Sequence, residues 1–291
     1  AQLAADALPL DLESLSGRAY YRAQEGGYAA GASDLAFRTR EGLAASAAEF
    51  SLSVARPAGQ PPRGEVRANG VDLKIAAALL DYLPVPPEAK AEANRYAPRG
   101  RLLDASLLWT GESPAKASAW RVKGRFEELG IQGVEGRPGI HGLTGSLEGD
   151  ERGGRLRLDS RGVLFEAPGL FRAPIGLDSL EARATWKREG PRLEVRIEDA
   201  KLANADAEVT VAGTWRSLPE SGGKSPGWVD LAGRVERARA TAVADYLPNN
   251  IEATRDWLDK AVLDGVAGGG RFELKGDLWE FPFRDPSKGR F

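Results

Sequence analysis

The residues that could carry catalysis are few in this 291-residue chain, and their spacing forms no catalytic motif. The single histidine, His141, lies in Pro-Gly-Ile-His-Gly-Leu, which predicts a solvated turn rather than a general base. Ser146 lies in a strand-like run and not in a Gly-x-Ser-x-Gly elbow. With one histidine and no cysteine, the usual clusters of nitrogen and sulfur metal ligands cannot form. We therefore expect no enzyme activity, no cofactor and no metal site.

Two glycine-rich segments resemble phosphate-binding loops but lack the required spacing. Gly222-Gly-Lys-Ser225 would need its first P-loop glycine at Leu218, so we interpret it as a hairpin loop. The glycines between Gly265 and Gly270 follow a predicted helix instead of opening one, which does not suit a dinucleotide. Carboxylates are plentiful, and a glycosidase pair stays open at this point. Most of them alternate with Arg and Lys on predicted strands, where cross-strand ion pairing explains them.

Charge and composition narrow the class of protein further. The 40 basic and 42 acidic residues are interspersed and give a net charge of −2, so there is no basic face for nucleic acid. A hydrophobic content of 42% with 28% charged residues is typical of a folded chain. No apolar run approaches the roughly 20 residues of a membrane span. The chain lacks an initiator Met and stops in a strand-like Lys-Gly-Arg-Phe, which predicts an excised piece whose signal or anchor lies elsewhere.

Alternation of apolar and charged residues is the main pattern along the chain. Strands are predicted over 28–40, 43–56, 64–73 and 101–109, and runs of period two continue from Trp120 to Glu236. Turn signals such as Gly190-Pro191 and Asn204-Ala-Asp206 separate the runs. Short strands joined by such turns predict an antiparallel sheet with one apolar and one charged face.

Two helical inserts interrupt the strands. Asp81-Tyr-Leu-Pro84 and Asp245-Tyr-Leu-Pro248 are 164 residues apart (245 minus 81), and a helix is predicted around each, over about 74–97 and 239–263. In the second, Asn249 or Asn250 is expected to cap the helix. Its predicted apolar stripe comprises Ile251, Trp257, Leu258, Ala261 and Val262. The predicted organisation is strands ending in a first insert (1–97), a second β-groove repeat ending in a second insert (98–263), and the start of a further β segment (264–291).

The apolar face of such a sheet must be covered, and the predicted helices are too few to do it. A second sheet could face the first, as in a sandwich, or the sheet could curl around an apolar ligand. Glycines stand among the large inward residues at Gly124, Gly213, Gly233 and Gly276. They are compatible with tight packing and curvature, and equally with a wall kept shallow for a guest.

The second insert and the segment after it resemble a known family. Tyr-Leu-Pro before a Trp-Leu helix, the glycine-rich exit into Arg-Phe-Glu-Leu-Lys-Gly-Asp-Leu, Phe281-Pro-Phe283 and the final Gly-Arg-Phe together resemble the YhdP branch of the AsmA-like, TamB-related proteins. The specific part covers only 245–291. The resemblance implies a mainly β protein: a long curled antiparallel sheet forming an elongated groove with an apolar interior. It further implies a periplasmic protein with an inner-membrane anchor outside this segment, which moves phospholipid toward the outer membrane without catalytic residues.

The expected function is therefore passive conduction of phospholipid between the inner and outer membranes. The expected partners are phospholipid acyl chains, further β-groove modules of the same polypeptide and other envelope proteins, with no nucleic acid. The Tyr-Leu-Pro helices would be buttresses or plugs, with Tyr82 and Tyr246 as packing residues. Two alternatives stay open: a closed-sandwich structural module of the envelope, or a carbohydrate-binding module using Trp109, Trp186, Trp215 and Trp228. The residues expected to line the groove are Val122, Phe126, Leu193, Val195, Ile197, Val209, Val211, Leu231, Val235, Phe272 and Leu274.

Overall fold

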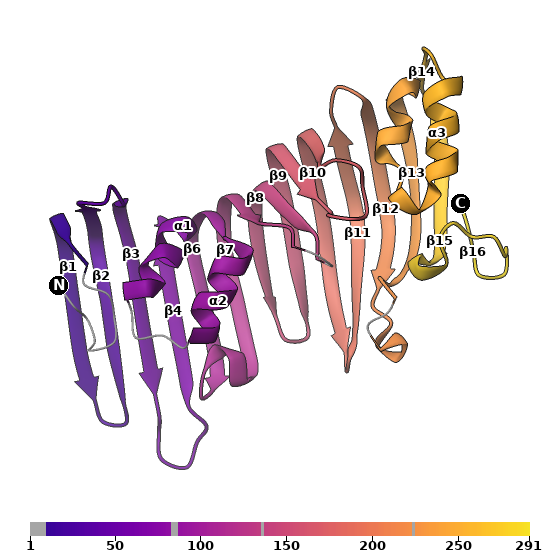
Figure 1. Ribbon diagram of the computed structural model, residues 1–291. Helices are drawn as coiled ribbons and strands as arrows, with labels where there is room; N and C mark the ends of the chain where they lie inside the picture. Colours follow the sequence, from indigo (N-terminus) through magenta and orange to yellow (C-terminus); the bar gives the residue numbers. More distant parts are fainter. Residues whose placement is uncertain (1–9, 83–86, 135–136, 223–224) are drawn as a thin grey trace. The chain divides into compact units, whose positions relative to one another are not determined.

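The computed structural model describes residues 10–82, 87–134, 137–222 and 225–291 (Figure 1). Strands dominate it, as predicted. The strands are β1 (Leu12–Gln24), β2 (Gly27–Thr39), β3 (Ala44–Ala55), β4 (Arg63–Asn69), β5 (Val71–Asp72), β6 (Arg99–Gly111), β7 (Ala117–Ile131), β8 (Gly139–Asp150), β9 (Gly153–Glu166), β10 (Ile175–Glu189), β11 (Arg192–Ala203), β12 (Ala207–Arg216), β13 (Trp228–Arg239), β14 (Val266–Ala267), β15 (Gly270–Asp277) and β16 (Gly289–Arg290).

Short helices interrupt this series at the two expected places. The first insert holds α1 (Leu73–Leu79), the 3₁₀ helix η1 (Leu80–Tyr82) and α2 (Pro87–Tyr96). The second holds η4 (Ala240–Tyr246), η5 (Asn249–Ile251) and α3 (Glu252–Ala261). Single 3₁₀ turns occur at η2 (Pro114–Lys116), η3 (Pro219–Ser221) and η6 (Leu278–Glu280). In the described part of the chain, no helix is both long and apolar enough to cross a bilayer.

One open antiparallel sheet contains all of the described strands. Its order follows the chain from β1 through β4 to β6 and on to β13, β15 and β16, while β5 pairs with β6 and β14 with β13. The pairings are antiparallel: hairpins join most neighbouring strands, and the two helical inserts join β4 to β6 and β13 to β15. The mainly β, antiparallel prediction is confirmed. The closed-sandwich alternative is wrong, since no second sheet faces the first in the described residues.

The strands fall into two compact units. The first comprises Ala1–Gln132 with Ser146–Glu151, and the second comprises Gly133–Gly145 with Arg152–Phe291. Strand β8 therefore contributes its first half to the second unit and its second half to the first. From the sequence, we divide the chain into repeats at residues 97 and 263. These repeats are not the same as the two compact units, and that division stays a prediction.

Local sequence explains where the first insert begins and why one predicted cap is wrong. The Asp72 side chain accepts a hydrogen bond from the Ile75 backbone N–H at 3.1 Å and caps α1. Helix α2 begins at Pro87, which suits the first helical position because its missing N–H is not needed there. Helix α3 begins after Ile251 with no side-chain cap at that residue, and the Asn249 side chain bonds Gly169 and Arg255 instead, so the capping expected from Asn249 is not made. The side chain of Asn250, the other expected cap, lies outside the described residues. The rest of the first signature, Leu83-Pro84, lies outside the described residues.

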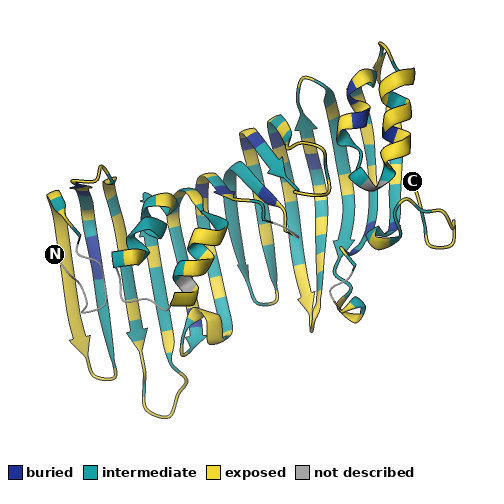
Figure 2. Ribbon diagram, in the orientation of Figure 1, coloured by how far each residue is buried: buried dark blue, intermediate teal, exposed yellow. Residues whose placement is uncertain are grey.

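The outward face of the sheet is charged and paired, as the alternation predicts. Arg183 bonds Asp199 on the neighbouring strand at 2.6 Å, and Arg290 contacts Glu273 at 2.7 Å. Such exposed pairs contribute little stability each, about 0–1 kcal/mol. Their main effect is to keep this face soluble, and Figure 2 shows the resulting alternation of exposed and half-buried positions along the strands.

The apolar face, by contrast, is only partly covered. The chain exposes 18313 Å², about 1.5 times the ~12,000 Å² that a compact monomer of 31.1 kDa would expose. Within the described residues, the largest fully buried side chains are only Val163 and Ser160, each 1% exposed. A single-layer sheet explains both facts, because there is no second layer to bury the apolar side.

The four glycines that stand among the large inward residues are in close contact with neighbouring strands and side chains. A Cβ on Gly124 would meet Ala105 at 3.1 Å, and one on Gly213 would meet the backbone oxygen of Asp230 at 2.1 Å. A Cβ on Gly233 would meet the Phe272 ring at 2.4 Å, and one on Gly276 the backbone oxygen of Lys288 at 2.7 Å. These positions therefore serve close packing rather than a shallow wall for a guest.

Candidate functional site

An apolar groove of about 620 Å³ lies on the inward face of the second unit. This volume is in the range of ligand-binding pockets, about 300–1,000 Å³. Seventeen of its 21 lining residues are apolar, and the four others, Asn204, Asp206, Arg239 and Tyr246, form one polar cluster. The groove can therefore bury an apolar ligand, and its one polar cluster can contact a polar group at the edge.

The floor of the groove is made by strands β8 to β13 and β15. Cross-strand register places Val209 opposite Val235, and Val211 opposite Gly233, which in turn lies opposite Phe272. These side chains share one face because directly opposed residues of a pleated sheet project to the same side. The remaining apolar floor residues are Ile140, Val163, Phe165, Ile175, Leu177, Leu180, Leu202, Ala207 and Ala238.

The second insert forms a roof over part of this floor. Ala242 and Val243 of η4 line the groove together with Tyr246 and Leu247. Ala242 is 3% exposed, so η4 is in close contact with the sheet beneath it. η4 contacts both β13 and α3, and Figure 1 shows α3 at the same end of the sheet as β13 and β15. The Phe291 side chain lines the groove as well.

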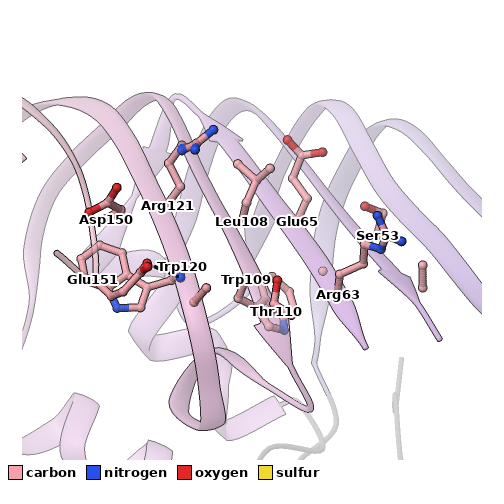
Figure 3. A pocket seen from close by; sticks show the side chains of 13 residues that line it. Ser53, Arg63, Glu65, Leu108, Trp109, Thr110, Trp120, Arg121, Asp150 and Glu151 are labelled. Carbon is pink, nitrogen blue, oxygen red and sulfur yellow. Dashed lines mark hydrogen bonds between the residues drawn. The ribbon is translucent and has the colours of Figure 1, made fainter. Parts of the chain in front are cut away.

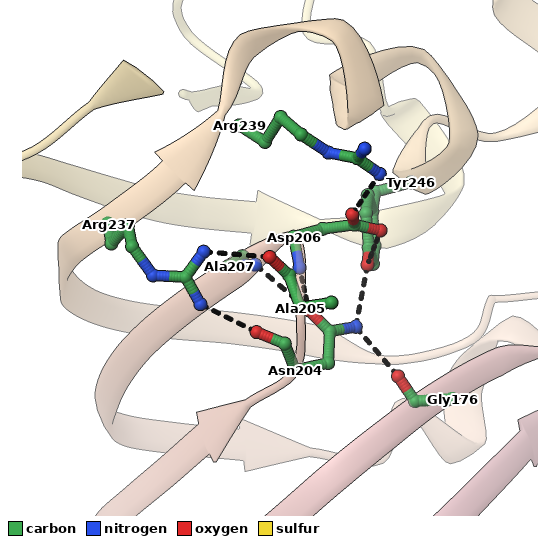
Figure 4. Close-up of polar contacts among 8 residues, drawn as sticks. All are labelled: Gly176, Asn204, Ala205, Asp206, Ala207, Arg237, Arg239 and Tyr246. Carbon is green, nitrogen blue, oxygen red and sulfur yellow. Dashed lines mark hydrogen bonds and ion pairs between the residues drawn. The ribbon is translucent and has the colours of Figure 1, made fainter.

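A polar network closes one margin of the groove (Figure 4). The Tyr246 hydroxyl donates to Asp206 Oδ2 at 3.0 Å and accepts from Asn204 Nδ2 at 2.7 Å. Asp206 also pairs with Arg239, and the Arg237 guanidinium donates to the carbonyls of Asn204 and Ala205 at 2.7 and 2.8 Å. Tyr246 is thus a hydrogen-bonding residue and not only the packing residue that was expected.

The Asn204-Ala-Asp206 turn holds this network in place. Asn204 Oδ1 accepts the backbone N–H groups of Asp206 and Ala207 at 3.0 and 2.9 Å, which is the self-bonded turn that Asn favours. The predicted turn signal is therefore confirmed, and it positions the Asp206 carboxylate for Tyr246.

Alkaline pH is expected to loosen the Tyr246 contact while neutral and acidic pH leave the hydroxyl intact. Burial raises the pKa of Tyr246 above its ordinary value of about 10, and the bond to Asp206 adds to this, while the bond from Asn204 opposes it. A raised pKa means that the protonated hydroxyl stabilises the fold below pH ~10, and this contribution is lost as pH rises through the folded-state pKa. Burial and the nearby Glu41 carboxylate also raise the pKa of Tyr82, so absorbance titration of tyrosinate should show late-ionising tyrosines, of which Tyr246→Phe removes one. An unchanged titration in that variant would contradict the assignment.

Four of the predicted lining residues are in this groove: Val209, Val211, Val235 and Phe272. Five others lie on the same face outside it. Register places Val195 opposite Trp215, Ile197 opposite Gly213, and Leu231 between Gly213 and Leu274, with Leu193 two residues before Val195. Val122 and Phe126 belong to the first unit, opposite Leu107 and Leu102 on β6. Their role in binding stays a prediction.

Sequence reasoning missed the β8 to β10 side of the floor and the roof. Ile175 and Leu177 do alternate with polar or small residues, so period two could have found them. The alternation in β9 changes phase at Gly162, where φ is +63°: Ser160 and Val163 are buried while the two residues between them are exposed. The roof residues lie in a 3₁₀ helix and the following residue, for which no simple periodic signal exists.

His141 is not in the solvated turn that the sequence suggested. It lies in strand β8, its side chain is 19% exposed, and its Nε2 is 3.4 Å from Glu166 Oε2. The flanking glycines suggested a turn, but they are accommodated within the strand. Its Nδ1 is buried without a hydrogen-bond partner. The buried Ser160 hydroxyl bonds the Thr144 backbone, so it does not complete a triad. Among the described residues there is no group of three or more His, Cys, Asp or Glu that could hold a metal ion.

A second pocket of about 440 Å³ lies in the first unit and combines two tryptophans with charged residues (Figure 3). Trp109 is only 6% exposed, and its ring fills the space that a side chain at position 64 would occupy. Trp186, Trp215 and Trp228 are half-buried. The strongly exposed tryptophans of the described residues are Trp257 and Trp279, on α3 and η6. The row of exposed tryptophans expected for a sugar-binding module is therefore not formed.

Comparison with known proteins gives one family. No curated protein and no solved structure matches the chain significantly. The family model described as "YhdP protein" matches residues 1–291, which is the full length of the sequence. The resemblance carried by residues 245–291 thus extends to the whole chain. The chain belongs to the YhdP family.

Proposed function

We propose that this chain is a segment of a bridge-like lipid transport protein that binds phospholipid acyl chains along the apolar face of its open sheet. The observation that carries this proposal is the roofed apolar groove of about 620 Å³ on a single-layer sheet. An open sheet with an apolar face needs a cover, and acyl chains supply one without a second protein layer. Each CH₂ group transferred from water contributes about 0.8 kcal/mol.

The same sheet is suited to passing a lipid along rather than trapping it. Beyond the groove, Val195, Ile197, Leu231 and Leu274 continue the apolar surface along β11, β13 and β15. The opposite face is charged and stays in water. Acyl chains could then move along one side while the headgroup stays at the wetted margin. This transfer requires no cofactor and no covalent step.

The compartment and direction are part of the proposal and rest on family membership. YhdP-family membership, together with the resemblance to AsmA-like proteins, supports a periplasmic location between the inner and outer membranes, with the anchor outside this segment. A reporter enzyme that is active only in the periplasm, fused to the full-length protein at a loop of this segment, tests the location. An inactive reporter with normal expression would contradict it.

Native mass spectrometry of the purified chain, with lipid extraction from the same sample, is expected to find bound phospholipid. The expected result is a mass shift matching one or more phospholipids, with the same species recovered by extraction. If the chain is free of lipid and also fails to bind a dye-labelled phospholipid offered in vesicles, the proposed function is wrong.

A further inference from the structure

The two Asp-Tyr-Leu-Pro inserts occupy equivalent positions in the strand order of their own units. The first follows β4 and β5, and the second follows β13. In each unit the tyrosine hydroxyl donates to a carboxylate in the hairpin turn that lies two strands earlier. Tyr82 donates to Glu41 Oε2 at 3.3 Å, in the turn between β2 and β3. Tyr246 donates to Asp206 Oδ2 at 3.0 Å, in the turn between β11 and β12.

The second insert, residues 240–263, is fastened on both sides of the groove, and we call it the strap. At its base the Ala240 N–H donates to the Gly265 carbonyl at 2.8 Å, so the two ends of the strap lie together beside β13. From there it reaches the Asp206 turn through Tyr246. It also reaches the loop before β10, where the Asn249 N–H donates to the Leu170 carbonyl at 2.8 Å. The strap therefore crosses the apolar face.

Its distal fastenings are polar and partly exposed to water. Besides Tyr246, Arg172 pairs with Asp259 at 2.9 Å and with Asp245 at 3.4 Å, and these side chains are 39 to 59% exposed. Asn249 Nδ2 donates to the Gly169 carbonyl at 3.2 Å. Such contacts exchange readily with water, so they can open without unfolding the sheet.

Little apolar area ties the strap to the sheet, and its base is built to pivot. The fully buried apolar side chains of the strap are the small Ala242 and Ala244, while Trp257 and Leu263 are 64% and 83% exposed. The strap joins β14 through Gly265, with φ +134°, and β14 itself is paired with β13, so Gly265 lies at the point where the strap leaves the sheet. Glycine changes backbone angles at low cost, which is what a hinge needs.

We propose that the strap is a gate held shut by the Tyr246–Asp206 hydrogen bond, and that its release opens the apolar groove beneath η4 to an acyl chain. The equivalent Tyr82–Glu41 bond holds the first insert in the same way. Ala242, Val243 and Leu247 would leave the roof when the gate opens. The identity of the cargo rests on the proposed function, whereas the movement of the strap does not.

Hydrogen–deuterium exchange of Tyr246→Phe tests the latch without any lipid. The variant keeps the ring and loses only the hydroxyl, so the fold is retained. Amides of 240–261 are expected to exchange at least tenfold faster, whereas those of β11 to β13 keep their rates. Tyr82→Phe should accelerate 73–82 and 87–96 and leave the strap unchanged. Tyr21→Phe, at a 70% exposed position, is the matched control. Unchanged strap exchange in Tyr246→Phe and in a second variant, Asp206→Asn, would overturn the latch.

Uptake of a dye-labelled phospholipid from phospholipid vesicles tests the gate. Tyr246→Phe is expected to take up lipid several-fold faster than the parent chain. Faster strap exchange with an unchanged uptake rate would overturn the gate. If strap exchange is faster but neither protein binds lipid, the proposed function fails and the gate with it, while the latch stands.

Discussion

Replacing Val211 by Glu is expected to abolish lipid retention by the purified chain. Val211 lines the groove from β12 and lies opposite Gly233, next to the Phe272 ring. An ionised carboxylate here would have no partner among the apolar side chains of the floor, and burying an unpaired charge costs far more than one or two buried CH₂ groups contribute. Since about 1.4 kcal/mol is a factor of ten in affinity, we expect at least a tenfold loss. Lipid extraction and native mass spectrometry measure it.

Thr210→Glu is the matched control for this variant. Thr210 precedes Val211 on the same strand and projects to the charged face, where Lys201 and Arg234 lie directly opposite on the two neighbouring strands. A carboxylate at this position gains two cationic neighbours, so folding and lipid content should both be preserved. A folded Val211→Glu protein that retains as much lipid as Thr210→Glu would refute the groove as the lipid path.

The sequence predicts which side chains of a strand lie on the apolar face, because the backbone of a strand points successive side chains to opposite faces. All nine predicted lining residues of the second unit, Leu193 and Val195 among them, lie on the apolar face. A pattern of period two cannot predict where the alternation of side chains between the two faces is interrupted. Gly162 in β9 and the irregular register between Ile197 and Ala200 in β11 each shift the phase, and both shifts occur in strands that form the groove floor. The floor residues that follow these breaks, Val163 and Phe165 in β9 and Leu202 in β11, were therefore missed.

In the helical inserts, too, a local periodic pattern predicts only part of which side chains are buried. The predicted stripe on α3 included Trp257, which is 64% exposed, whereas Arg255 is only 8% exposed. The half-buried members of the predicted stripe, Ile251, Leu258 and Val262, lie on the same side of the helix as Arg255, so the stripe is confirmed there, whereas Trp257 and Ala261 are exposed. The Arg255 guanidinium donates to Asn249 Oδ1 at 2.8 Å, and Asn249 is itself bound to the 169–170 loop. These partners come from distant parts of the chain, which a local periodicity cannot represent.

Strand β1 and His141 show that distant partners also decide which residues form strands. Residues 12–24 form a strand although 12 of the 13 are exposed, because pairing with β2 satisfies the backbone without burying a face. His141 stays in β8 despite glycine neighbours because strand pairing in an extended sheet overrides a local turn preference. Both cases depend on hydrogen bonds to other strands, and neither leaves an apolar pattern in its own sequence.

Gly213→Ala is expected to cause the largest loss of stability of any single methyl added to the second unit's sheet. Gly213 has φ +143°, which L residues rarely adopt, and a strain of this kind costs on the order of 1–3 kcal/mol. Its Cβ would also lie 2.1 Å from the Asp230 backbone oxygen and 2.8 Å from the Leu231 Cα, so β12 and β13 would have to separate. Overpacking of this type adds about 1–3 kcal/mol.

Gly176→Ala is the control that separates strain from the loss of a glycine as such. Gly176 is in β10 of the same unit, its φ is not positive, and no atom lies within 4 Å of its Cβ position. The change should leave stability within about 0.5 kcal/mol. Urea unfolding followed by circular dichroism compares the two midpoints. Equal midpoints would mean that β12 and β13 tolerate separation at Gly213. The tight floor inferred for this part of the sheet would then be wrong, and the choice between a packed wall and a wall kept shallow for lipid would be open again.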